Sequence, residues 1–135
     1  MPIDPLSIAR VFACLFFAVL FLQSGMDKVL DRKGNLDWLT GHFAQTPFKN
    51  SVPLMLSTVT LVELSAGVCS LVGAVGAVFE PLRAFMTVGT GLACLALLML
   101  FFGQRIAKDY PGAASLATYF VVALVSLFLV GHQPR

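Results

Sequence analysis

The sequence predicts an all-α membrane protein: a bundle of four transmembrane helices with a short interfacial helix in its first connection. Of its 135 residues, 58% are hydrophobic and only 12% are charged, whereas soluble domains carry about 25% charged residues. Four apolar runs are each long enough to cross about 30 Å of hydrocarbon, which takes about 20 helical residues. Runs of this length also exclude a small membrane barrel, because its strands would alternate apolar and polar residues.

The four runs lie at about residues 6–26, 52–79, 84–103 and 112–131. Pro5 precedes the first run and suits the first turn of a helix. The chain start lacks the basic segment and the small-residue cleavage site of a secretory signal, so we expect the first run to remain as a membrane span. No repeat or linker divides the sequence, and residues 1–135 are therefore expected to form a single domain.

The connections between the runs differ in length. A tight turn at residues 80–83 joins the second and third runs, and a short charged link at residues 104–111 joins the third and fourth. The first connection, residues 27–51, is longer. Within it Trp38 accompanies apolar residues at helical spacing, which favours a helix lying on the membrane surface with Trp38 at headgroup level. The alternative is an irregular loop with scattered apolar residues.

Two details support a helix in this connection. The apolar residues that recur at helical spacing are Leu36, Leu39 and Phe43. Before them, Gly34-Asn35 is typical of a turn and a helix cap. We therefore expect the interfacial helix to start near this pair.

The basic residues predict an orientation. Three of them lie on the side of the termini and the second connection, and six lie on the opposite side. The positive-inside rule then places both termini outside and the first and third connections in the cytoplasm. For a bacterial cytoplasmic membrane, the termini would be periplasmic.

The second run carries small residues at spacings of three and four. Helices in lipid associate by close backbone approach, so this strip is expected to be a packing face. It consists of Ala66, Gly67, Ser70 and Ala74. Glu63 continues the same strip, so we expect its carboxylate to face the packed interior and to need a partner or a proton.

Polar groups from three runs fall at similar depths on one side of the membrane. We predict that they form a polar corner able to hold a quinone or lipid head group. The predicted ligand-binding residues are Gln23, Lys28, Glu63, Arg105, Asp109 and Tyr119. Two alternatives stay open: Glu63 pairs with Lys28 or Arg105 only to lock the bundle, or it handles a proton.

Several motifs together resemble the DoxX family of small four-helix membrane proteins. They are Arg10, the Phe21-x-x-Ser24-Gly25-x-x-Lys28 ending, Glu63 in a Gly/Ala-rich run, and residues 103–114 with the sequence GQRIAKDYPGAA. The likeness extends over about residues 6–131. It implies a bacterial cytoplasmic-membrane protein that acts as an accessory subunit of a larger, often redox-linked complex. The thiol chemistry of some relatives needs paired cysteines, and Cys14, Cys69 and Cys94 form no such pair.

The sequence thus favours an accessory subunit with a quinone or lipid as ligand and no covalently bound cofactor. A purely structural or assembly subunit is the first alternative, and a small transporter working as a homo-oligomer is the weaker one. No catalytic residues and no metal ligands are predicted, so the chain is not expected to be catalytic alone. The formal net charge of +2 and the absence of a basic-aromatic stripe argue against nucleic-acid binding.

Overall fold

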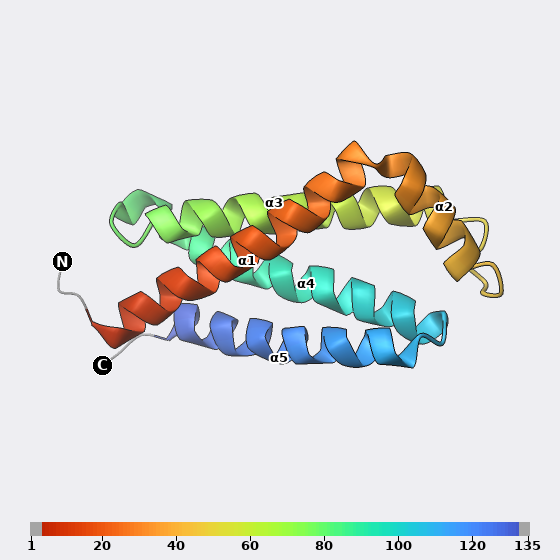
Figure 1. The fold of residues 1–135 in the computed structure, drawn as a ribbon. Helices are drawn as coiled ribbons and strands as arrows, with labels where there is room; N and C mark the ends of the chain where they lie inside the picture. Colours follow the sequence, from red (N-terminus) through yellow and green to blue (C-terminus); the bar gives the residue numbers. More distant parts are fainter. Residues whose placement is uncertain (1–3, 133–135) are drawn as a thin grey trace.

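Four long helices run up and down through the molecule, with a short helix after the first (Figure 1). The computed structural model describes residues 4–132, and these contain helices and no strand. The elements are α1 (Pro5–Leu30), α2 (Arg32–His42), α3 (Val52–Val75), the 3-10 turn η1 (Glu80–Leu82), α4 (Ala84–Ile106) and α5 (Tyr110–Gly131). The all-α class, the four-helix bundle and the helix in the first connection are confirmed.

The helices pack in the order α1, α3, α4, α5. Figure 1 shows α1 running obliquely across the others: its start lies beside the end of α5, and its end lies over α3, next to α2. Near the termini, Arg10 fixes this crossing, because its Nε donates to the Leu129 carbonyl at 2.8 Å and its Nη2 donates to the His132 carbonyl. Arg10 therefore ties α1 to the open carbonyls at the end of α5.

Acidic residues begin three of the helices. Asp4 accepts the Ser7 N–H at 2.7 Å, and this hydrogen bond lowers the pKa of the exposed Asp4 carboxyl. Asp109 accepts the Gly112 N–H at 3.0 Å at the start of α5. Such caps satisfy backbone donors that have no partner in the first turn.

The start of α2 differs from the expectation placed on Gly34-Asn35. Asp31 is the N-cap, and both residues lie inside the helix. The Gly34 N–H donates to the Asp31 carboxylate at 3.2 Å, and the Asn35 side chain donates to the Asp31 carbonyl at 2.9 Å. The pair therefore completes a cap set by Asp31 and does not itself mark the helix start.

The helix ends also shift from the predicted spans. Helix α1 continues to Leu30, so the charged Asp27 and Lys28 lie on its last turns, and α3 ends at Val75 and not near residue 79. Charge alone does not stop a helix once its side chain has a partner or reaches water, which explains the longer α1. Residues 76–79 form the turn before η1.

Small residues allow close contact on two sides of α3. A Cβ added to Gly67 would lie 2.9 Å from the Leu22 backbone nitrogen of α1. A Cβ added to Gly89 of α4 would lie 2.6 Å from the Ser70 backbone nitrogen. Ala66 is fully buried in the core, while Ala74 is only partly buried and packs in a second cluster near the termini. The predicted strip is thus divided between contacts with α1 and with α4.

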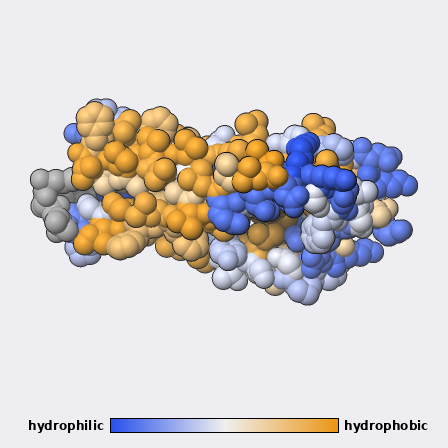
Figure 2. All heavy atoms as spheres, turned by 45° about the horizontal axis from the view of Figure 1, so that its top comes forward, coloured by the Kyte–Doolittle hydropathy of each residue, from blue (hydrophilic) through white to orange (hydrophobic). Residues whose placement is uncertain are grey.

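The hydrophobic and hydrophilic parts of the surface lie at different positions along the long axis of the molecule. Figure 2 shows hydrophobic atoms over most of this face and hydrophilic atoms gathered around the α2 end. Large apolar side chains point outward from the long helices, including Phe12, Leu61 and Phe128, each about two-thirds exposed. Four helices are long and apolar enough to cross a membrane. The molecule is a multi-pass membrane protein whose helices contact lipid.

Candidate functional site

A buried ion pair joins α1 to the middle of α3. Lys28 Nζ lies 2.9 Å from Glu63 Oε1. Glu63 is 1% exposed and the Lys28 side chain 16%. The ammonium also donates to Ser24 Oγ, one turn earlier on α1, at 2.7 Å. Ser24 and Glu63 therefore hold the ammonium between two helices at the end of α1.

The carboxylate of Glu63 depends on this one cation. Its contact with Lys28 lacks the angle of a hydrogen bond, and neither carboxylate oxygen has a hydrogen-bond donor among residues 4–132. An ion buried in this way is stabilised chiefly by its counterion. Removal of Lys28 would leave an uncompensated charge inside the bundle.

Close packing of α1 on α3 positions the pair. A Cβ added to Gly25 would lie 2.6 Å from a methyl carbon of Leu64, the residue after Glu63. A side chain at position 25 would have to displace the Leu64 side chain beside the place where the two charges meet. Gly25 thus lets Lys28 reach a carboxylate that lies at the middle of the next transmembrane helix.

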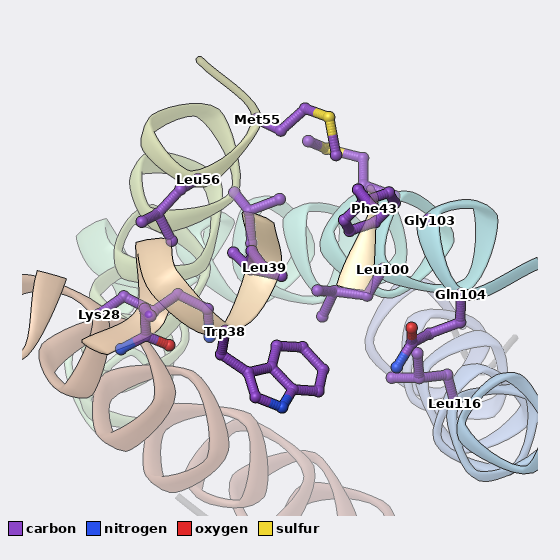
Figure 3. Close-up of a pocket in the computed structure, with 13 residues that line it drawn as sticks. Lys28, Trp38, Leu39, Phe43, Met55, Leu56, Leu100, Gly103, Gln104 and Leu116 are labelled. Carbon is purple, nitrogen blue, oxygen red and sulfur yellow. The ribbon is translucent and has the colours of Figure 1, made fainter. Parts of the chain in front are cut away.

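Beside Lys28 lies a cavity of about 230 Å³ beneath α2 (Figure 3). Every helix contributes to its wall, and most of the wall is apolar. The lining residues are Lys28, Asn35, Trp38, Leu39, Phe43, Met55, Leu56, Val59, Met99, Leu100, Gly103, Gln104 and Leu116. An apolar hollow with a few polar groups at its edge is the usual form of a small-molecule site.

The polar side chains lie at separate places on the cavity wall. In Figure 3, Lys28 and Gln104 lie on opposite sides, with Leu39 and Leu100 between them. Gln104 Oε1 lies 2.6 Å from Nε2 of His42, which connects α2 to α4. The His42 ring stacks on Trp38, with 4.4 Å between the ring centroids. These contacts hold α2 over the cavity.

Of the six predicted ligand-binding residues, Lys28 and Glu63 are in direct contact, and only Lys28 lines the cavity. Asp109 caps α5, and its carboxylate lies 3.9 Å from His42. Arg105 is exposed and its guanidinium lies over the Tyr110 ring, 4.6 Å from the centroid. The predicted corner is therefore smaller than the sequence indicated.

Gln23 and Tyr119 lie away from this corner. Gln23 is exposed on α1, because five residues correspond to about 140° around a helix and turn it away from Lys28. Tyr119 is 38% exposed, and its ring lies 6.3 Å from that of Phe16. The prediction grouped these side chains because of their similar depth along the helices, but similar depth does not put them on the same face.

His42, Trp38 and Gln104 belong to the site although they are not among the residues predicted from the sequence. The four-residue spacing of Trp38 and His42 puts both on one face of α2 and could have indicated a shared surface. The contact between His42 and Gln104 joins residues 62 positions apart, and no local pattern reports it.

In comparisons with known proteins, no family model, no curated protein and no solved structure matches this chain.

Proposed function

We propose that this protein binds a lipophilic molecule with a polar head, such as a quinone or a lipid, in the cavity beneath α2. The observation that carries the proposal is the mostly apolar cavity, whose lining includes Lys28 as its one charged residue among residues 4–132. The aliphatic wall suits a ring or chain, and the ammonium suits an oxygen acceptor. A volume of about 230 Å³ accommodates a head group and the start of a tail, and the tail would continue into lipid.

The resemblance to the DoxX family supports a wider role. We infer that the chain acts as an accessory subunit of a larger, redox-linked complex in a bacterial cytoplasmic membrane. With α2 on the cytoplasmic side and both termini outside, the bound head group would lie near the cytoplasmic surface. The chain would present the ligand to a partner that carries out the reaction.

A purely structural subunit is the second candidate. It is favoured by Glu63, which is paired with Lys28 inside the bundle and does not line the cavity. In that case the ion pair fixes the crossing of α1 and α3, and the outer faces of the helices dock on a partner without any ligand. The two functions differ in whether the cavity is occupied.

Trp38 allows a direct test of occupancy. It is the only tryptophan in the chain and it lines the cavity. We would reconstitute the full chain in lipid nanodiscs and titrate a decyl-tailed benzoquinone, which quenches tryptophan fluorescence on contact. The proposal predicts saturable quenching.

Two leucine substitutions on α4 form a matched pair for this test. Gly103 lines the cavity, so Gly103→Leu fills it. A Cβ at Gly91 meets no other described atom within 4 Å, so Gly91→Leu adds the same side chain elsewhere. Binding should weaken at least about tenfold in Gly103→Leu, a change of about 1.4 kcal/mol, and persist in Gly91→Leu. Unsaturable quenching, or equal binding by both variants, would contradict a ligand function.

A further inference from the structure

We propose that Glu63 sets the charge selectivity of the cavity: by neutralising Lys28 it makes the site take uncharged amphiphiles with an oxygen acceptor and reject anionic ones. This inference rests on the proposed function, because it specifies the ligand of the same cavity. It assigns Glu63 a role in specificity although its side chain does not line the cavity. The role is exerted through Lys28, which makes Glu63 a positioning and charge-balancing residue.

The charges on the cavity wall provide the first step. Lys28 is the only charged residue among the described residues that line it. Its ammonium lies 2.9 Å from the Glu63 carboxylate, so the pair has a net charge of zero. The other hydrogen-bonding side chains of the wall are the amides of Asn35 and Gln104 and the indole of Trp38, and all three are uncharged. The cavity therefore presents hydrogen-bonding groups without a net positive charge.

Three charged side chains near this site make their contacts outside the cavity wall. Arg32 of α2 donates to Ser57 Oγ at 2.8 Å. Arg105 of α4 lies over the Tyr110 ring. Asp109 caps α5. None of these three residues lines the cavity.

A neutral acceptor can replace a weak hydrogen bond of Lys28 and leave the net charge of the site unchanged. An ammonium has three donors. Besides Ser24 Oγ and Glu63, the one further hydrogen-bond acceptor of this nitrogen among the described residues is the Ser24 carbonyl, at a long 3.4 Å. A ketone or ester oxygen at the cavity wall would take the place of this long contact. The ion pair would stay intact.

An anionic head group would change the net charge of the site. It would compete with Glu63 for the same ammonium and leave one negative charge without a counterion. Burial of an unpaired charge in an apolar surrounding is strongly unfavourable. Glu63→Gln removes the competing charge while it keeps nearly the same shape, so the variant should accept anions that the native site rejects.

The test compares two probes with the same tail. An ω-bromononyl methyl sulfone is neutral and accepts hydrogen bonds, and ω-bromononanesulfonate differs from it by one charged oxygen in place of a methyl group. The bromine quenches Trp38 at short range, so both are measured by the fluorescence of the full chain in nanodiscs of zwitterionic lipid. The cavity-filled Gly103→Leu variant gives the quenching that comes from lipid alone, and Gly91→Leu is the matched control.

The wild type should bind the sulfone at least about tenfold more tightly than the sulfonate. In Glu63→Gln, the sulfonate should gain at least about tenfold, while the sulfone should change less than about threefold. Equal binding of the two probes by the wild type, or tighter binding of the sulfonate, would overturn the inference and leave the proposed function standing. The wild-type ratio decides the matter even where Glu63→Gln does not fold. Absence of saturable binding for both probes would overturn the inference and the proposed function together.

Discussion

Loss of Lys28 should destabilise the bundle more than loss of both members of its ion pair. At the 2.9 Å separation of Lys28 Nζ and Glu63 Oε1, the attraction between unit charges is about 6 kcal/mol for an effective dielectric constant of about 20. The desolvation of both ions offsets much of this energy. Lys28→Met leaves Glu63, which is 1% exposed, as a buried charge without a counterion, and breaking such a pair costs about 3–5 kcal/mol.

The double variant Lys28→Met/Glu63→Leu removes both charges and should recover most of this loss, because apolar replacements of a buried pair are often neutral or stabilising. The assay is equilibrium unfolding in mixed micelles of a mild detergent and dodecyl sulfate, analysed as a double-mutant cycle. Lys33→Met is the matched control, because Lys33 is exposed on α2 and its loss should change the free energy of unfolding by less than about 0.5 kcal/mol. A loss for Lys28→Met no larger than this control, or a double variant as unstable as the single one, would refute the reasoning.

Two further predictions concern the packing of α4 and the position of α2. Gly89→Ala should lower the free energy of unfolding by about 1–3 kcal/mol, because its Cβ would lie 2.6 Å from a backbone nitrogen of α3. Gly91→Ala has open space around it, so in the same assay it should be neutral or stabilising by up to about 1 kcal/mol. His42→Phe keeps an aromatic ring on Trp38 and loses the hydrogen bond to Gln104, so hydrogen exchange in α2 should quicken while that in α4 is unchanged; an unchanged rate in α2 would show that this hydrogen bond does not hold it.

The fold was largely predictable from the sequence, because the bilayer fixes its main dimensions. A run of about 20 apolar residues has few options in lipid other than a helix. The burial of Glu63 was also predictable, since an unpaired carboxylate facing lipid is costly. Lys28 and Arg105 were both possible partners on sequence grounds, and the structure pairs Lys28 with Glu63 while Arg105 lies over a tyrosine ring.

The composition of the candidate site was less predictable, because depth was the only coordinate available. Residue counts along a helix give depth, whereas the direction of a side chain depends on how each helix is rotated against its neighbours. Gln23 shows this limit: it lies less than two turns from Lys28 on α1, yet it is exposed. The tilt of α1 and the place of α2 follow from contacts between distant residues, and no local sequence pattern reports those contacts.

One crossing geometry accounts for both the ion pair and the cavity. Gly25 and Gly67 let the second half of α1 approach the middle of α3 closely, and there Lys28 reaches Glu63. At the other end, Arg10 holds α1 against α5. Helix α1 therefore leaves α5 as it approaches α2 (Figure 1), and α2 covers the cavity that lies beside Lys28. The residues that bring the two charges together thus also create the space beside them, which is why a change at the ion pair is expected to appear in both stability and ligand selectivity.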